Sequence, residues 1–219
     1  TAIEDISIMR ALPRMSVFAP CDKEEMRRLV PQTMDMGGPC YIRLAKGGDE
    51  IISKPENGFE IGQSILLREP GDMRLIGTGL GTTRALHAAD ELAREGIHCG
   101  VLHMHTLKPL DRQAILHWAE QMDFIVTVEE HTLNGGLGSA VGDVLIDEFE
   151  GQMPKLLRLG IPDRFTDKYG SQDDLLQPFF QSIFLDGAVL GVLNLSGVLS
   201  GVTAFHFLKL AKCEVKISA

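Results

Sequence analysis

The fold is decided by residues 73–104, MRLIGTGLGTTRALHAADELAREGIHCGVLHM. An apolar run at 73–77 leads into a glycine-rich turn, and residues 82–95 then carry apolar side chains three and four positions apart. A second apolar run follows at 98–104. This order predicts a strand, a helix and a second strand that pairs in parallel with the first.

The same alternation continues toward the C-terminus. Apolar runs at 123–130 and 154–160 predict two more strands, and helical spacing appears at 111–121 and 136–150. Repeated strand–helix–strand units form parallel sheets covered on both faces. We therefore expect an α/β fold from about Gly71 to about Gln177, a doubly wound domain with a mostly parallel sheet.

The pattern toward the N-terminus is shorter. Residues 15–19 and 40–44 predict two strands, with a helix between them that begins after Asp22. Asp22 and Glu25 have the spacing of a capping box, and Pro31 is expected to kink that helix or end it early.

Composition divides the chain into four parts. Residues 48–71 mix Gly, Pro, Asn and acidic residues, which predicts a linker carrying a hairpin or an edge strand. We expect residues 1–47 to end one domain, 48–71 to be the linker and 72–178 to form the α/β domain. Residues 179–219 form an apolar tail of unlike composition.

Charge and cysteine content exclude several classes of protein. The 219 residues carry a net charge of -9, and residues 72–178 hold seventeen Asp and Glu against nine Lys and Arg. Acidity of this kind disfavours nucleic acid and anionic membranes as partners. The four cysteines lack zinc-finger spacing, so we expect no metal ligands and a reducing, cytoplasmic location.

Two glycine-rich turns are candidate sites. The turn at 77–82 lacks the third glycine and the later acidic residue of a dinucleotide fingerprint, so close strand–helix packing explains it better than a nicotinamide cofactor. The turn at 129–139 begins with Glu129, Glu130 and His131. Adjacent strand residues face opposite sides, so the two glutamates cannot share one pocket if the strand persists. Proton transfer and a structural helix start with loop hydrogen bonds or subunit contacts both fit this pattern.

Histidine and arginine supply further candidates. His103 and His105 have a spacing that suits a metal in an extended segment, but no third ligand accompanies them, which favours a structural or interface role. Arg43 ends a predicted strand and precedes Lys46, Gly47 and Gly48. A guanidinium at that position could bind a phosphate or carboxylate, or form an ordinary salt bridge.

Six segments, in order, resemble successive signatures of the C-terminal part of transketolase-like enzymes, the thiamine diphosphate superfamily. They are IEDISIMRALPRMSVFAPCDKEEMRRLV (3–30), PCYIRLAKGG (39–48), GTGLGTTRALHAADELAREGI (77–97), HTLKPLD (105–111), VTVEEHTLNGGLGSAVGD (126–143) and GIPDRFTDKYGSQDDLLQ (160–177). The resemblance covers residues 1–177. It implies the end of a pyrimidine-binding domain followed by a transketolase C-terminal domain.

The resemblance implies an enzyme that transfers a two-carbon ketol unit from a ketose to an aldose, with thiamine diphosphate and Mg²⁺ as cofactors of the complete enzyme. Arg43 matches the arginine that binds the phosphate of the sugar substrate. The loop with Glu130 and His131 matches one whose chemical role the resemblance does not assign. It also implies a homodimer or a heterotetramer with an N-terminal section or subunit.

Several family features are absent from this sequence. The GDG motif with its following Asn, the activating glutamate and the stacking aromatic do not occur, and Thr1 would follow a Thr-His pair. We therefore expect the chain to be inactive and cofactor-free alone. A two-component transketolase fits best, with a 1-deoxy-D-xylulose-5-phosphate synthase as the alternative; a non-catalytic dimerisation or regulatory module is a third hypothesis.

The tail differs from the family pattern. Residues 187–208 contain no Asp, Glu, Lys or Arg, and that length could span a bilayer. Glycines, Asn194 and hydroxyl residues weaken insertion, so we expect no membrane span; a hairpin at a subunit interface or an extension foreign to the fold are the alternatives.

Overall fold

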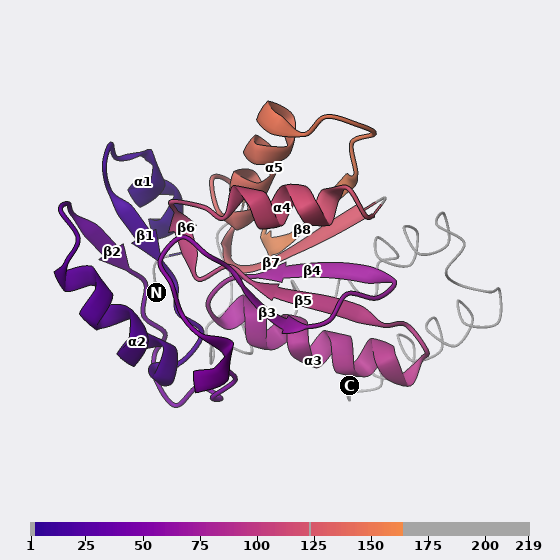
Figure 1. The fold of residues 1–219 in the computed structure, drawn as a ribbon, viewed down its shortest axis with the longest axis horizontal. Helices are drawn as coiled ribbons and strands as arrows, with labels where there is room; N and C mark the ends of the chain where they lie inside the picture. The colour runs from indigo at the N-terminus through magenta and orange to yellow at the C-terminus, as the bar shows by residue number, and fades with distance from the viewer. Residues whose placement is uncertain (1–2, 123, 164–219) are drawn as a thin grey trace, which may run out of the picture. The chain divides into compact units, whose positions relative to one another are not determined.

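The computed structural model describes residues 3–122 and 124–163 (Figure 1). The elements are α1 (Asp5–Ala11), β1 (Ser16–Phe18), α2 (Lys23–Met34), β2 (Cys40–Ile42), the 3-10 helix η1 (Pro55–Asn57), β3 (Ile65–Arg68), β4 (Met73–Gly77), α3 (Leu80–Arg94), β5 (Cys99–His103), β6 (Thr106–Lys108), α4 (Arg112–Ala119), β7 (Phe124–Thr132), α5 (Leu137–Glu148) and β8 (Lys155–Ile161). The expectations for residues 164–219, including the apolar tail, lie outside the described residues.

The larger sheet has the strand order β3-β5-β4-β7-β8. Neighbouring strands β5, β4, β7 and β8 are parallel, and β3 pairs antiparallel with β5 at one edge. Helix α3 covers one face of this sheet, and α4 and α5 cover the other (Figure 1). The α/β, doubly wound and mostly parallel architecture predicted from the sequence is confirmed.

Burial explains why the central strands show no alternation of polar and apolar residues. All five residues of β4 and all five of β5 are buried, as parallel strands between two helical layers require. On the side of α4 and α5, the core includes Ile76, Ile115, Ile125 and Val141, with Trp118 packed among them. Arg74 lies over the Trp118 ring at 5.4 Å from its centroid.

A smaller sheet has the order β2-β1-β6. Strands β1 and β2 are parallel, whereas β6 is antiparallel to β1. Strand β6 directly follows β5 in the chain, so the chain passes from the larger sheet straight into the smaller one. The sequence predicted neither β6 nor α1.

Most element boundaries agree with the sequence-based expectations within two residues. Strand β3 is the predicted edge strand of the 48–71 segment, and it is part of the larger sheet. Asp22 caps α2 by accepting hydrogen bonds from the Glu24 and Glu25 amides. The expectation of an early end at Pro31 was wrong, since α2 continues to Met34, and the alternative of a kink stays a prediction. The missing N–H of Pro31 removes one hydrogen bond near the C-terminal end of the helix, which the helix tolerates.

Among the described residues, the longest helix has fifteen residues, and none combines the length and apolar content needed to cross a bilayer.

Candidate functional site

The N-terminal segment meets the larger sheet where its parallel strands end. The Gly79 amide donates to the Ala19 carbonyl at 3.1 Å, and the Ala19 amide donates to the His105 carbonyl at 2.8 Å. Farther along the edge, the Thr132 amide donates to the Ile3 carbonyl at 2.7 Å. In doubly wound sheets this edge is where ligands and partners bind, at the point where successive crossovers leave in opposite directions. Here that point lies between β4 and β7, which lead into α3 and α5 on opposite faces.

Two groups of buried or partly buried residues, joined by hydrogen bonds, occupy this edge. The His103 cluster comprises Cys21, Glu25, Thr82 and His103. The His131 cluster comprises Ser7, Arg10, Glu129, His131 and the two glycines 135 and 136. Each connects the first 47 residues to the larger sheet.

A chain of short hydrogen bonds holds the His103 cluster together. His103 Nε2 lies 2.8 Å from Glu25 Oε2, and His103 Nδ1 lies 2.6 Å from Thr82 Oγ1. The Cys21 amide also donates to Glu25 Oε2, at 2.7 Å. The side chains of His103 and Glu25 are fully buried. Glu25 and His103 are 78 positions apart in sequence, so helix α2 and strand β5 are tied directly through side chains.

Burial and charge act in different directions within this cluster. Burial alone would raise the pKa of the Glu25 carboxyl, but His103, His105 and the Cys21 amide together hold it below its usual value. Burial and the Glu25 and Asp22 carboxylates raise the pKa of the Cys21 thiol far above its usual range. Without a cation, the cluster therefore contains a carboxylate and a protonated thiol.

His105 does not complete a metal pair with His103. Its ring stacks on Phe59 with the centroids 4.1 Å apart, and its Nδ1 lies 2.8 Å from Thr106 Oγ1. Burial and the neighbouring His103 lower the pKa of His105 to about 4, so the ring is neutral near pH 7. This agrees with the structural interpretation of the i, i+2 histidines.

In the His131 cluster, Glu129 caps helix α5. Its carboxylate accepts hydrogen bonds from the Leu137 amide at 2.6 Å and from the Gly138 amide at 2.8 Å. Burial raises the pKa of Glu129 to about 7, although these two amides oppose the shift. Glu130, the next residue, is only partly buried. Strand β7 extends to Thr132, but its pairing with β8 shifts register between Val128 and Thr132, so the opposite facing of the two glutamates stays a prediction.

Both ring nitrogens of His131 have partners within the protein. Nδ1 lies 2.7 Å from the Thr132 carbonyl, so we assign the proton to Nδ1, and Nε2 accepts the Ser7 amide at 3.3 Å. Burial lowers the pKa of His131, consistent with a neutral ring. These contacts match the loop-hydrogen-bond interpretation of the 129–139 turn.

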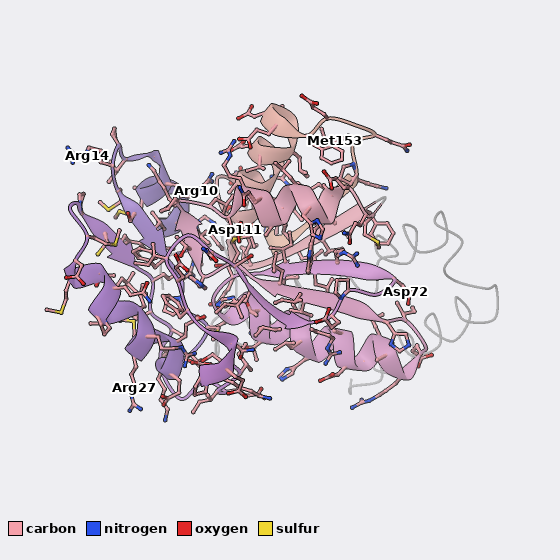
Figure 2. The ribbon with its side chains drawn as sticks, in the orientation of Figure 1. Arg10, Arg14, Arg27, Asp72, Asp111 and Met153 are labelled. Atoms are coloured by element: carbon pink, nitrogen blue, oxygen red, sulfur yellow. The ribbon has the colours of Figure 1, made fainter. Side chains whose placement is uncertain are left out.

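Arg10 completes the connection between α1 and this turn (Figure 2). Its guanidinium donates to the Gly135 carbonyl at 2.6 Å and to the Gly136 carbonyl at 3.1 Å. A Cβ atom at position 136 would lie 1.9 Å from Glu129 Oε2, so only glycine fits between the cap and the histidine.

Arg43 follows strand β2 and forms an ion pair. Its Nη1 lies 3.2 Å from Asp5 Oδ1, and its side chain is 14% exposed. The Tyr41 hydroxyl donates to the other oxygen of Asp5 at 2.7 Å. Lys46, three residues later, is exposed and precedes Gly47 and Gly48, both with positive φ.

The family implied by the sequence uses a diphosphate cofactor with Mg²⁺, but neither glycine-rich turn fits a diphosphate. At the first turn, the amides of Gly79, Gly81 and Thr82 all donate to backbone carbonyls, and a Cβ on Gly81 would lie 2.4 Å from the Val128 carbonyl oxygen. This supports the close-packing interpretation. At the second turn, the Glu129 carboxylate already occupies the helix amides.

Sequence reasoning missed Cys21, Glu25 and Arg10 as members of these clusters, and Asp5 as the partner of Arg43. Cys21 and Glu25 are four residues apart at a helix start, a spacing that brings two side chains together. Their partner His103 has no local signal that points to them, because only the tertiary fold brings it near.

The fold and the edge described above define the class of protein: a doubly wound α/β fold whose strand ends contact an N-terminal segment that carries a small sheet of its own. The family model described as "Transketolase, C-terminal domain" matches residues 62–182, more than half of the chain. The chain belongs to the transketolase C-terminal domain family.

Curated relatives extend the similarity into the N-terminal segment. The "6-deoxy-6-sulfo-D-fructose transketolase subunit SqwH" of Clostridium sp. (strain MSTE9) is 39% identical over 178 residues, 81% of this chain and 54% of the relative. A "putative transketolase C-terminal section" from Methanocaldococcus jannaschii is 39% identical over 80% of this chain and 54% of its own length. The 1-deoxy-D-xylulose-5-phosphate synthase of Synechococcus sp. (strain WH7803) is 38% identical over 74% of this chain and 25% of its own. The chain thus spans about half the length of the transketolase relatives that it matches.

Solved structures show the same fold. A structure titled "Split gene transketolase, inactive beta4 tetramer" matches 97% of this chain and 61% of its own with a TM-score of 0.75 and 33% identity. The transketolase of Campylobacter jejuni aligns with a TM-score of 0.62 over 82% of this chain and 26% of its own, and its 21% identity shows the fold alone.

Proposed function

We propose that this chain is the C-terminal component of a thiamine diphosphate-dependent transketolase, which transfers a two-carbon ketol unit from a ketose to an aldose. The observation that carries this proposal is the 39% identity to two relatives named as a transketolase subunit and a transketolase C-terminal section. The structure titled as a split-gene transketolase supports it. An N-terminal section or subunit supplies the remaining domain, in a homodimer or heterotetramer in the cytoplasm.

In the assembled enzyme, thiamine diphosphate supplies the electron sink that stabilises the carbanion left by C–C cleavage. Neither glycine-rich turn of this chain fits the diphosphate, so we assign its binding, with Mg²⁺, to the N-terminal partner. The contribution of this chain is positional: the His103 and His131 clusters hold residues 1–47 against the larger sheet, where that segment completes the pyrimidine-binding domain.

We assign substrate binding to Arg43, as the phosphate-binding residue of the sugar substrate. The support is its place directly after β2 and its match to the phosphate-binding arginine of the family that the sequence resembles. Its ion pair with Asp5 is the alternative role, a salt bridge, which a substrate phosphate would have to displace. Arg43→Lys should raise the KM for phosphorylated substrates and leave the KM for unphosphorylated sugars unchanged, because lysine lacks the bidentate fork. Arg27→Lys, on the exposed surface of α2 (Figure 2), is the matched control. An equal change for both substrate types would remove Arg43 from the phosphate site.

The central experiment combines this chain with a separately produced N-terminal transketolase subunit, with thiamine diphosphate and Mg²⁺ present. We expect ketol transfer only from the mixture, with a co-migrating complex in size-exclusion chromatography. A complex without ketol transfer would favour the non-catalytic dimerisation or regulatory module. Absence of both would overturn the component assignment.

A 1-deoxy-D-xylulose-5-phosphate synthase is the second candidate function, and it has its own supporting observation. Curated enzymes of that name reach 38% identity, although the chain covers only about a quarter of their length. Assaying the same mixture for 1-deoxy-D-xylulose 5-phosphate decides between the two reactions.

A further inference from the structure

We propose that Cys21, Glu25 and His103 supply three ligands of a Zn²⁺ site between helix α2 and strand β5. Among the residues that the structure describes, they make up the one group of at least three metal-ligating side chains whose donor atoms lie within 4.8 Å of one another. A thiolate, a carboxylate and an imidazole together are a donor set that Zn²⁺ accepts in proteins. The site is independent of the proposed ketol transfer.

The chemistry of the donors favours Zn²⁺ over Mg²⁺. Mg²⁺ requires oxygen ligands in octahedral geometry, and this group offers a single carboxylate. Thiolate sulfur and imidazole nitrogen bind Zn²⁺ at about 2.3 Å and about 2.0–2.1 Å. Donor atoms within 4.8 Å of one another need only small shifts to reach those distances around one ion.

Thr82 gives His103 the orientation of a metal-bound histidine. Thr82 Oγ1 lies 2.6 Å from Nδ1 and accepts its proton in the tautomer that binds metal through Nε2. In that tautomer Nε2 has a free lone pair directed at Glu25 Oε2, 2.8 Å away. A cation bound by both atoms replaces the proton that they share in its absence. Because 2.8 Å is shorter than the separation of two ligand atoms around one tetrahedral Zn²⁺, the two side chains move slightly apart when it binds.

An unpartnered buried oxygen is the second observation that indicates a ligand. Glu25 Oε2 accepts hydrogen bonds from the Cys21 amide and His103, but Glu25 Oε1 has no partner although the side chain is fully buried. A buried carboxylate oxygen without a partner costs free energy, and a bound cation removes that cost.

The charges balance when the metal binds. The Cys21 thiol gives up its proton to solvent, and the thiolate and the Glu25 carboxylate together neutralise the two positive charges of Zn²⁺. Asp22 is not available as a ligand, because its carboxylate already accepts bonds from the amides of Glu24, Glu25, Ile52 and Ser53. Those bonds instead fix the turn that carries Cys21.

The position of the site explains what the metal does. Cys21 and Glu25 belong to the N-terminal segment, and His103 ends a central strand of the larger sheet. Zn²⁺ would therefore link the two parts of the chain, in addition to the hydrogen bonds already present.

Metal binding to the full-length, tag-free chain tests the proposal. The protein is refolded from urea with Zn²⁺ or Co²⁺, dialysed, and measured for metal content and for the thiolate-to-Co²⁺ charge-transfer absorption. We expect one equivalent of metal, a charge-transfer band, and a higher unfolding midpoint with Zn²⁺ than with a chelator.

Variants assign the ligands. Thr82→Val should lower Zn²⁺ affinity by about 10- to 100-fold, since it removes only the orienting hydroxyl. Cys21→Ser, nearly isosteric, should lower the affinity further and abolish the charge-transfer band. Cys99→Ser is the matched control, because Cys99 is another buried thiol, outside the cluster. Circular dichroism confirms that each variant is folded.

Two results would overturn the proposal of a Zn²⁺ site. One is folded wild-type protein without stoichiometric Zn²⁺ or Co²⁺ after refolding, which would leave the cluster a hydrogen-bonded network only. The other is metal binding that Cys21→Ser and Cys99→Ser change equally, which would place the metal elsewhere in the chain.

Discussion

The His103 and His131 clusters perform the same task in different ways. Both attach the first 47 residues to the edge where the parallel strands end. In the His103 cluster the attachment is the side-chain contact between Glu25 and His103, which the Cys21 amide supports on one side and Thr82 Oγ1 on the other. In the His131 cluster the partners of Arg10, Glu129 and His131 are almost all backbone amides and carbonyls.

This difference determines how each attachment can be broken. A side-chain network fails when one partner is removed, because the remaining buried polar group has nothing to bind. A backbone network around glycines fails when a side chain is added at a glycine. The backbone amides and carbonyls belong to a close-packed turn and helix, so they cannot move to make room unless the helix moves as well. The predictions below test this contrast.

Removal of one partner in the His103 cluster should have the largest effect. His103→Leu leaves the Glu25 carboxylate buried without its charged or hydrogen-bonding partner, and breaking a buried pair in this way costs about 3–5 kcal/mol. Urea unfolding in the presence of a chelator measures the change without any contribution from metal.

The matched control is His98→Leu, at an exposed position one residue before β5, where we expect a change within about 0.5 kcal/mol. The double substitution of Glu25 and His103 by leucine should cost less than the sum of the single ones, because no polar group is then left unpaired. Additive losses would show that the pair is not coupled.

Glu129 should make stability depend on pH. Its pKa of about 7 in the folded protein exceeds the value of about 4.3 in an unfolded chain, so the folded state binds the extra proton between those values. Stability from this group is therefore present at low pH and is lost as pH rises toward about 7. The loss is about 2.5 kcal/mol between about pH 5 and pH 7.5.

Glu129→Gln removes this titration, so the wild-type and variant unfolding curves should converge or cross as pH rises. His105, whose pKa is lowered, contributes with the opposite sign in both proteins and cancels in the difference. His131 lies 3.8 Å from Glu129, so its contribution is measured separately in His131→Gln. A wild-type-minus-variant difference that does not change with pH would contradict the raised pKa of Glu129.

The His131 cluster should lose stability when a side chain is added at one of its glycines. Gly136→Ala places a methyl group 1.9 Å from Glu129 Oε2 and 2.7 Å from His131 Nδ1, and the resulting overpacking should cost about 2 kcal/mol. Gly142→Ala, within the same helix, meets only Leu156 at 3.5 Å and should stabilise by up to about 1 kcal/mol through helix propensity. Equal effects at the two positions would show that the Glu129 cap tolerates displacement.

The same contrast explains what the sequence could predict. Periodicity located the strands of the larger sheet and helices α3 to α5, because their burial patterns are continuous over many residues. It missed α1 and β6, which are short and are stabilised by contacts with distant segments rather than by their own pattern. The glycines of the turn at 129–139 are a local signal that the sequence shows directly. The pairing of Glu25 with His103 has no such signal, because the two residues are 78 positions apart in the chain.

Tyr41 provides the smallest and most local test. Its hydroxyl donates to Asp5 Oδ2 at 2.7 Å, while Asp5 Oδ1 pairs with Arg43. Tyr41→Phe removes one hydrogen bond and should cost about 1 kcal/mol in urea unfolding, because Asp5 retains its ion pair. In an Asp5→Ala background the same substitution should cost close to nothing. A coupling near zero in this double-mutant cycle would mean that the Tyr41–Asp5 hydrogen bond does not stabilise α1. A coupling of about 1 kcal/mol would show that a side-chain contact holds this helix as well.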